Sequence, residues 1–145
     1  MEAFADKRRR MIEDQIVARG IVDQAVLQAM RTVPRELLVS DSTVEFAYED
    51  TPLPIEEGQT ISQPYVVALM AAALKLTSRD RVLEVGAGSG YAAAMLSRIA
   101  AEVYAIERHE ALAELARRRM TELGFDNVHI LHGDGTLGVA RACAL

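Results

Sequence analysis

Cysteine, tryptophan and long apolar runs are scarce or missing in this sequence. Of its 145 residues one is cysteine and none is tryptophan. The single cysteine, Cys143, excludes an internal disulfide and a zinc cluster built on cysteines, and it fits a reducing compartment. The longest apolar run, over residues 66–74, is far too short to span a membrane. No apolar segment follows the N-terminal charges, so the sequence predicts a cytoplasmic protein with no secretory signal and no membrane contact.

Positive charge is also in the minority. The 16 basic residues are outnumbered by 21 acidic ones, which gives a net charge of −5. This balance argues against a nucleic-acid-binding protein that relies on bulk positive charge. The basic run Lys7–Arg10 is interpreted as a solvated helix face. Half of the residues are apolar, which excludes a disordered or low-complexity chain and allows one domain with a core.

The first 50 residues have the pattern of two helices. Apolar residues among charges over residues 4–19 predict an amphipathic helix that ends at Gly20. Asp23 then predicts the N-cap of a short second helix, which Pro34 brings to an end.

From Asp50 to Pro64 the pattern changes from helical to extended. Prolines at 52 and 54 fix an extended path, and residues 56–58 favour a turn. Ser62 is well placed to be the N-cap of a following apolar helix over about residues 65–76.

The second half of the chain alternates between short apolar strands and helices. Strands are predicted at 81–85, 102–107 and 127–131, and helices at 91–100 and 109–123. This alternation predicts a parallel sheet with right-handed crossovers. In such sheets ligands bind beyond the carboxyl ends of the strands. The glycine-rich residues 86–90, Glu107 and Asp134 all fall at those ends, so we expect them to converge.

These strand ends carry the groups that a nucleoside requires. The glycines of residues 86–90 let backbone N–H groups approach a ligand without interference from a Cβ atom. The carboxylate of Glu107 can accept hydrogen bonds from both hydroxyls of a ribose, and Asp134 is placed to meet an adenine amino group. Dinucleotide-binding proteins use the pattern G-x-G-x-x-G, but Tyr91 stands here where its last glycine belongs.

The acid inside the strand, Glu84, and the G-x-G-x-G spacing after it resemble class I S-adenosylmethionine-dependent methyltransferases. In that class the loop packs against the methionine part of a cationic sulfonium. Longer strings resemble one family of the class, the protein-L-isoaspartate O-methyltransferases, over about residues 8–138. These strings are Gly20-Ile-x-Asp23, Val33-Pro-Arg-Glu36, Asp50-Thr-Pro-Leu-Pro-Ile-Glu-Glu-Gly-Gln-Thr-Ile-Ser-Gln-Pro64, Val82-Leu-Glu-Val-Gly-Ala-Gly-Ser-Gly-Tyr91 and Gly133-Asp-Gly135.

The resemblance implies an α/β fold, Rossmann-like, with a doubly wound and mostly parallel sheet. Residues 1–64 would supply helices and a segment that covers substrate and cofactor, and residues 65–138 the core that binds S-adenosyl-L-methionine. The implied reaction transfers a methyl group to the α-carboxylate of L-isoaspartyl and D-aspartyl residues in damaged proteins. S-adenosyl-L-homocysteine is released, and the ester closes to a succinimide, which begins repair.

The resemblance also implies site residues. Ser62 matches the active-site serine, whose hydroxyl would hydrogen-bond the acceptor carboxylate. That carboxylate is already ionised at neutral pH and needs no general base. A plain helix N-cap is the equal alternative for Ser62, and Asp50 either orients residues 52–54 or forms a turn. The residues expected to contact the cofactor are Gln59, Thr60, Ile61, Glu84, Gly86, Ala87, Gly88, Ser89, Gly90, Glu107, Arg108, Asp134 and Gly135.

Other interpretations stay open. The three histidines, His109, His129 and His132, are interpreted as incidental, and no metal site is expected. A methyltransferase for a small molecule or RNA, a fragment that binds the cofactor without turnover, and a nicotinamide oxidoreductase are the alternatives to the repair enzyme.

The resemblance ends after Gly138, and residues 139–145 are atypical. The family pattern would continue into a fourth strand beside residues 81–85, so we expect an incomplete sheet of about three core strands. An unpaired apolar edge is a candidate surface for self-association. Three explanations of the incomplete sheet stay open. The chain is a truncated or frameshifted product, a piece of a longer polypeptide, or part of an assembly with another chain. For the chain alone we expect association or low stability, and weak or no activity.

Overall fold

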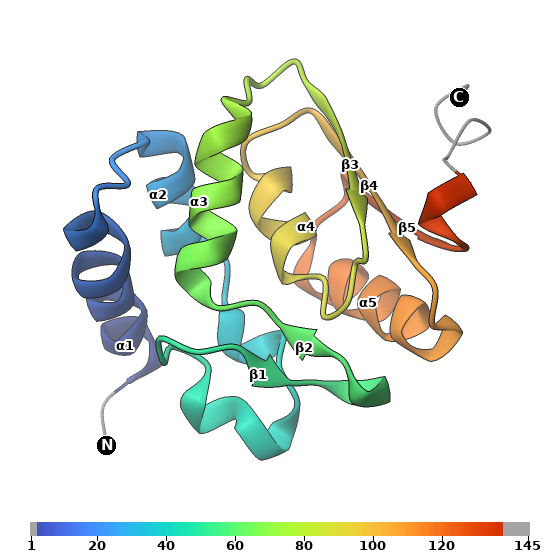
Figure 1. The fold of residues 1–145 in the computed structure, drawn as a ribbon, viewed down its shortest axis with the longest axis horizontal. Helices are drawn as coiled ribbons and strands as arrows, with labels where there is room; N and C mark the ends of the chain where they lie inside the picture. Colours follow the sequence, from blue (N-terminus) through green and yellow to red (C-terminus); the bar gives the residue numbers. More distant parts are fainter. Residues whose placement is uncertain (1–2, 138–145) are drawn as a thin grey trace.

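Three parallel strands form the centre of the computed structural model, which describes residues 3–137 (Figure 1). β3 (Arg81–Val85), β4 (Glu102–Glu107) and β5 (Val128–His132) lie in the order β3-β4-β5. Both pairings are parallel, and Ile106 lies opposite Val85 on one side and Leu131 on the other. The three expected core strands are confirmed, although β5 begins and ends one residue later than predicted.

Two helices, α4 (Tyr91–Ser97) and α5 (Glu110–Leu123), pack against this sheet, and α3 (Pro64–Leu74) packs against the N-terminal helices. Figure 1 shows α3 and α4 on the same side of the sheet. Alternate strand side chains, among them Val103, Ala105 and Ile130, are buried in the core. The predicted helices 91–100 and 109–123 are therefore present, but the first ends three residues early and the second begins one residue late.

The edge strand β3 exposes apolar side chains. Within residues 3–137 it pairs only with β4, and the exposed fractions of Leu83 and Val85 are 45% and 63%. The unpaired edge expected from the sequence is present in the described part of the chain. Self-association through it stays a prediction, and the tail at 139–145, which was interpreted as atypical, lies outside the described residues.

One continuous helical run begins the described chain, as predicted for residues 4–19. It is α-helical in α1 (Phe4–Arg10), widens to a π-helical turn (Met11–Ile16) and tightens to a 3₁₀ turn (Val17–Arg19). Gly20 ends the run with φ of +92°, a left-handed conformation that favours glycine.

The basic run on α1 is only partly a solvated face. Arg8 donates hydrogen bonds to the Tyr48 hydroxyl at 2.8 Å and to the Arg31 carbonyl at 3.1 Å, and it forms an ion pair with Glu36 at 3.0 Å. Its guanidinium is therefore a link within the fold, which corrects the interpretation from sequence. Arg9 follows the expected pattern, since it is exposed and pairs with Glu13 one turn away.

The second helix, α2 (Gln24–Thr32), begins at the predicted cap. The Asp23 carboxylate accepts the backbone N–H groups of Ala25 at 3.0 Å and Val26 at 3.2 Å. These are donors that the first turn of a helix leaves without an intrahelical partner. Short 3₁₀ turns follow at Arg35–Leu37 and Asp41–Phe46.

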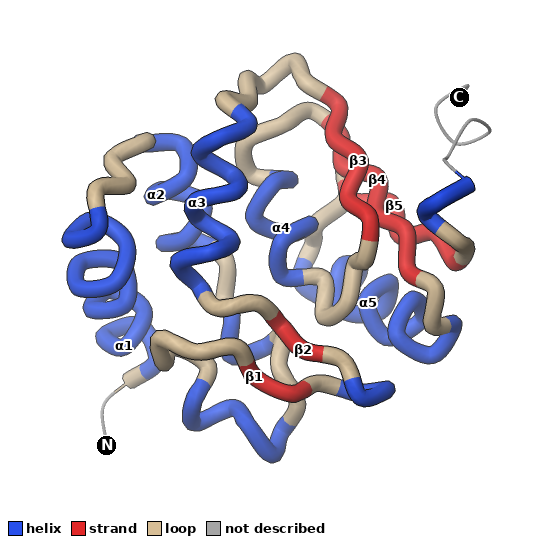
Figure 2. The backbone as a smooth tube through the Cα atoms, viewed as in Figure 1, coloured by secondary structure: helices blue, strands red, loops and turns tan. Residues whose placement is uncertain are grey.

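A small antiparallel hairpin lies below α3 and the loop that follows β3 in the view of Figure 2. It consists of β1 (Leu53–Pro54) and β2 (Thr60–Ile61), joined through a 3₁₀ turn at Glu56–Gly58. The extended path and the turn predicted for this stretch are confirmed.

The predicted N-cap at Ser62 is wrong. α3 begins at Pro64, Gln63 is its N-cap residue, and no side chain caps it. Ser62 therefore lies one residue too early, because the extended path of β2 continues up to Gln63. α3 ends at Leu74 and not at 76, since Lys75 adopts a left-handed conformation with φ of +50°. No helix among residues 3–137 is long and apolar enough to cross a bilayer.

The Asp23 cap supports a prediction about stability. Asp23→Ala removes the acceptor for two backbone donors and is expected to lower the free energy of unfolding by about 1 kcal/mol. Asp23→Asn keeps a side-chain oxygen at the cap and should lose much less. Urea unfolding of both variants measures the difference. Equal losses for the two would contradict the capping role.

Candidate active site

A cavity of about 280 Å³ lies at the carboxyl ends of the three strands. It is lined by residues from the hairpin, the glycine loop and the ends of β3, β4 and β5. These are Gln59, Thr60, Val85, Gly86, Gly88, Ile106, Glu107, Arg108, His109, Gly133, Asp134, Gly135 and Thr136. The predicted convergence of the glycine loop, Glu107 and Asp134 is confirmed.

Glu107 ties the end of β4 to the glycine loop. Its residue is 5% exposed, and its Oε2 accepts the Gly88 N–H at 2.8 Å. Its Oε1 accepts the His109 N–H at 2.9 Å. Each carboxylate oxygen can accept two hydrogen bonds, so both oxygens retain capacity toward the cavity. The expected role in accepting two hydroxyls is therefore compatible with this geometry.

The backbone N–H groups of the glycine loop behave differently from our expectation. Those of Gly86 and Ala87 both donate to the Ile106 carbonyl, at 2.7 and 3.0 Å, and that of Gly88 donates to Glu107. Those of Gly90 and Tyr91 donate to Ala87 and Ser89 within the loop. These five donors are therefore engaged inside the protein. A pyrophosphate needs such donors free, so the loop does not suit a dinucleotide.

Asp134 lies at the exposed end of the cavity, just after β5. Its Oδ1 accepts both the N–H of Thr136 at 2.9 Å and its hydroxyl at 2.7 Å. These hydrogen bonds lower the pKa of Asp134 below its ordinary value. The group is thus an ionised acceptor at neutral pH, as contact with an amino group requires.

A smaller cavity of about 60 Å³ adjoins the first one, and Thr60, Gly86 and Gly88 line both. The other residues that line the smaller cavity are Ile61, Ser62, Val67, Glu84, Ala87, Ser89, Tyr91 and Ala92. The geometry therefore brings Ser62 and the in-strand acid Glu84 to one wall of a continuous site. Gly90 was expected among the cofactor contacts but lines neither cavity. A Cβ atom there would lie 2.9 Å from the Met120 side chain, so Gly90 serves the packing of α5.

One carboxyl oxygen of Glu84 has no hydrogen-bond partner among the described residues. Its Oε2 is shielded from solvent and accepts no hydrogen bond from residues 3–137. Burial, with the nearby charge of Glu107 as the smaller cause, raises the pKa of Glu84 to about 8. A cationic group placed here would satisfy this oxygen and favour its ionised form.

The Ser62 hydroxyl is available to a ligand. The residue is exposed and lines the small cavity, and its side chain makes no hydrogen bond to any residue between 3 and 137. Only its carbonyl is engaged, by Arg35 at 2.8 Å. With the helix-cap alternative removed, contact with a ligand is the remaining prediction for this hydroxyl.

Charged side chains hold the hairpin over the glycine loop. Arg119 of α5 lies 3.5 Å from the Glu56 carboxylate in the hairpin turn and donates to the Ser89 carbonyl at 3.4 Å. Ile55 of the hairpin packs 3.6 Å from the position that a Cβ atom of Gly88 would occupy. A Cβ atom there would make only an ordinary van der Waals contact, so the φ of +52° is what favours glycine at this position.

Asp50 was predicted either to orient residues 52–54 or to form a turn, but its side-chain contacts are with other residues. It pairs with Arg19 and accepts the side-chain amide of Gln63 at 2.5 Å. These partners hold the pKa of Asp50 at about 2. Asp50 therefore ties Gln63, which is the N-cap residue of α3 and follows Ser62, to Arg19 at the end of the first helical run.

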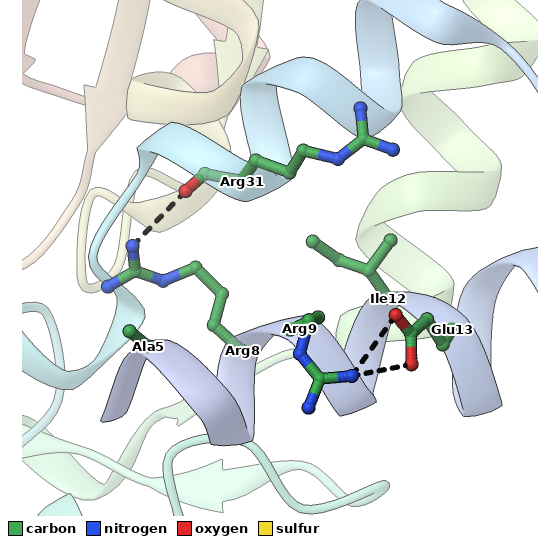
Figure 3. Close-up of a pocket in the computed structure, with 6 residues that line it drawn as sticks. All are labelled: Ala5, Arg8, Arg9, Ile12, Glu13 and Arg31. Carbon is green, nitrogen blue, oxygen red and sulfur yellow. Dashed lines mark hydrogen bonds and ion pairs between the residues drawn. The ribbon is translucent and has the colours of Figure 1, made fainter. Parts of the chain in front are cut away.

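Other cavities occur in the described part of the chain. One of about 400 Å³ opens between α1 and α2 and is lined by Ala5, Arg8, Arg9, Ile12, Glu13 and Arg31 (Figure 3). Its cations Arg8 and Arg9 are already paired with carboxylates, and none of the predicted site residues lines it. Another, of about 530 Å³, runs along the open edge of β3 beside α3 and shares Ser62, Glu84 and Gly86 with the smaller cavity, so it borders the site.

Sequence reasoning missed several residues at the site. His109 and Thr136 line the cavity of about 280 Å³, and their positions just after β4 and β5 were the signal that could have found them. Arg35 donates a hydrogen bond to the Ser62 carbonyl. Its position in an apolar segment was the one signal in the sequence that could have indicated the burial of Arg35. His129 and His132 lie elsewhere, and residues 3–137 contain no cluster of three metal-ligating side chains.

The site combines an acid inside β3, a glycine loop whose N–H groups are bonded within the protein, and an acid at the end of β4. On a parallel sheet these features are typical of one class of enzyme. The fold is that of a Rossmann-like S-adenosylmethionine-dependent methyltransferase. A solved protein-L-isoaspartate O-methyltransferase superposes with a TM-score of 0.84 at 33% identity, over 92% of this chain and 44% of that one. A Plasmodium falciparum protein assigned to the same enzyme, in complex with S-adenosyl-L-homocysteine, gives 0.71 at 26% identity over 92% and 64%.

The sequence comparisons identify the family. The model for protein-L-isoaspartate(D-aspartate) O-methyltransferase matches residues 6–144. The match therefore extends past Gly138, where the resemblance was expected to end. Protein-L-isoaspartate O-methyltransferase 2 of Pelobacter propionicus is 61% identical over 91% of this chain and 59% of its own length. The corresponding protein 1 of Geotalea uraniireducens is 57% identical over 93% and 62%. The chain belongs to the protein-L-isoaspartate(D-aspartate) O-methyltransferase family, and it spans about three fifths of the length of these curated relatives.

The raised pKa of Glu84 leads to a prediction about pH. The unfolded chain loses this proton near the ordinary value of 4.5, but the folded protein keeps it up to about 8. Between these values the folded state binds more protons, so stability falls as the pH rises. Because each pKa unit corresponds to about 1.4 kcal/mol, the Glu84 contribution amounts to a few kcal/mol.

Glu84→Gln removes the titration with little change in shape. We expect the variant to gain stability over the unmodified protein between pH 5 and pH 8.5, as measured by thermal unfolding across that range. Glu122→Gln, at an exposed position of α5 with no ion pair among the described residues, is the control and should show no such trend. A stability difference between Glu84→Gln and the unmodified protein that does not vary with pH would contradict the assignment.

Proposed function

We propose that this chain binds S-adenosyl-L-methionine and holds the α-carboxylate of an L-isoaspartyl or D-aspartyl residue for methylation. One observation carries the proposal. Ser62, whose hydroxyl is free, lines the same small cavity as Glu84 and Gly86, and this cavity adjoins the one lined by Glu107 and Asp134. Family membership supports the substrate class. The partners would be damaged proteins or peptides, and the ester formed would close to a succinimide.

The residues present fit the proposed cofactor. Glu84 has a shielded oxygen without a partner, which suits the ammonium group of the methionine part. Glu107 retains acceptor capacity for ribose hydroxyls, and Asp134 retains it for an adenine amino group. The loop from Gly86 to Gly90 offers few free donors, which suits a cationic cofactor better than an anionic one.

When bound, the cofactor supplies an electrophilic methyl group on a positively charged sulfur. Protein groups then need only bind and orient the acceptor, because a carboxylate is ionised at neutral pH and no base must remove a proton. The Ser62 hydroxyl would donate a hydrogen bond to one carboxylate oxygen and direct the other toward the small cavity. Placing two reactants in this way is a large source of rate enhancement.

The hairpin would contribute by excluding water. It is held over the glycine loop by the Arg119–Glu56 pair and by the packing of Ile55 on Gly88. A water-poor site strengthens each electrostatic contact to the acceptor and limits hydrolysis of the product ester.

The substrate assignment is tested with a matched pair of peptides. We expect methyl transfer from labelled S-adenosyl-L-methionine to an isoaspartyl peptide, at the low rate expected for the chain alone, and none to its aspartyl twin of the same sequence. The two differ only in the position of the free carboxylate. Equal labelling of both, or labelling of neither by a chain that binds S-adenosyl-L-homocysteine, would exclude the repair activity for this chain. Calorimetry should show binding of S-adenosyl-L-homocysteine and none of NAD.

The role of Ser62 is tested by Ser62→Ala. Loss of one hydrogen bond to a charged acceptor corresponds to a decrease in methyl transfer of about 10- to 100-fold. Affinity for S-adenosyl-L-homocysteine and thermal stability should stay the same, because the hydroxyl bonds no other described residue. Ser78→Ala, at an exposed position before β3, is the matched control. A variant with full activity would remove Ser62 from the site.

A further inference from the structure

Arg35 is a fully buried arginine that connects three segments of the site. Its residue is 0% exposed. Nε donates to the Ala47 carbonyl at 2.6 Å, and one terminal nitrogen donates to the Ser62 carbonyl at 2.8 Å. Its guanidinium carbon lies 4.7 Å from the centre of the Tyr91 ring. Tyr91 begins α4 directly after the glycine loop and lines the small cavity.

The positive charge of Arg35 is not neutralised by a carboxylate. No ion pair of Arg35 occurs within residues 3–137. The adjacent Glu36 is paired with Arg8 at 3.0 Å and accepts the Tyr48 hydroxyl, so that pair is neutral as a unit. Tyr48 and Tyr91 are the other titratable groups that face Arg35. Burial lowers the pKa of Arg35, but arginine stays protonated in the neutral range.

Such an arrangement is costly for the fold. A buried charge without a counter-ion destabilises a protein by several kcal/mol, and an apolar side chain of similar length could fill the same space. The remaining terminal nitrogen of Arg35 and the Tyr91 hydroxyl are also shielded from solvent, and each faces the other without a hydrogen bond of good geometry. Fold stability alone therefore gives no reason for a cation at this position.

We propose that Arg35 is a positioning residue for the acceptor: it fixes the main chain of Ser62 and places an uncompensated positive charge behind it, which selects a carboxylate. This rests on the proposed function, in which an anionic acceptor meets the Ser62 hydroxyl. Arg35 lines neither cavity of the site, so it acts through Ser62 and Tyr91 and does not contact the acceptor. Its field would favour an anion in the cavity without forming a direct ion pair that holds the acceptor too tightly.

The experiment compares Arg35→Met, which keeps the length and removes the charge, with Arg35→Lys, which keeps the charge and loses the fork of donors. The control is Arg98→Met, since Arg98 lies 4.4 Å from the Phe125 ring in a similar contact away from the site. For each protein we would measure affinity for S-adenosyl-L-homocysteine, the KM and kcat for an isoaspartyl peptide, and inhibition by the same peptide with its α-carboxylate converted to a carboxamide.

For Arg35→Met we expect a KM at least tenfold higher, an affinity for S-adenosyl-L-homocysteine within threefold of the unmodified protein, and no remaining preference for the carboxylate over the carboxamide. Arg35→Lys should keep the preference but lower kcat, because Ser62 is held less firmly. If Arg35→Met does not fold, the retained preference of Arg35→Lys decides the charge effect. Arg98→Met should change none of the three values.

An unchanged preference for the carboxylate in Arg35→Met would overturn the proposal, as would loss of that preference in Arg35→Lys. A fall in cofactor affinity and stability with KM unchanged would show a purely structural role. Failure of the proposed function gives a different result. In that case the unmodified protein itself would not distinguish isoaspartyl from aspartyl peptides, and the role of Arg35 would fall with it.

Discussion

The parallel pairing of β3 with β4 is the constraint on which the site depends. With Val85 opposite Ile106, the chain leaving β3 meets the end of β4, and the N–H groups of Gly86 and Ala87 both reach the Ile106 carbonyl. Glu107, the next residue, then accepts the Gly88 N–H. The loop is thereby fixed by the sheet before any ligand binds. This arrangement supplies a preformed surface, so little conformational entropy needs to be lost on binding.

Charged side chains fix the direction of the hairpin and of Ser62, in addition to the apolar core that the N-terminal segment shares with the sheet. Arg119 reaches from α5 to the hairpin turn, Asp50 joins Arg19 to Gln63, and Arg35 holds Ser62. Each contact is directional, whereas apolar packing alone would allow residues 59–63 to shift along the core. A hydroxyl that must meet one oxygen of an acceptor gains more from direction than from additional buried area.

The order of strands and helices was predictable because its pattern is local. Alternation of apolar runs with amphipathic stretches depends on neighbouring residues, and so does the cap at Asp23. The cavity-lining acids were predictable for a related reason, since parallel topology brings strand ends together whatever the details of packing. Glu107 and Asp134 could therefore be placed at one site although 27 positions separate them.

The features that sequence reasoning missed depend on contacts between distant segments. Whether Ser62 caps α3 is decided by where the hairpin ends, and the extended path continues one residue further than the local pattern indicates. The burial of Arg35 depends on Ala47, Ser62 and Tyr91 meeting in space. The engagement of the loop N–H groups depends on the register of β3 and β4. None of these pairings leaves a periodic trace along the chain.

The distribution of charge also bears on the chemistry proposed. Transfer of a methyl group from a sulfonium to a carboxylate neutralises both reactants, so the charge separation of the ground state disappears as the reaction proceeds. A site that removes water lowers the barrier for such a step, provided that it can still bind two opposite ions. Glu84, Glu107 and Asp134 lie on the side proposed for the cation, and Arg35 lies behind the group proposed to hold the anion. Because Arg35 reaches the acceptor only through Ser62, its attraction would bring the carboxylate into place without a direct contact that must be broken in the transition state. Binding both ions by fields and single hydrogen bonds, rather than by tight ion pairs, would keep the ground state from being stabilised more than the transition state.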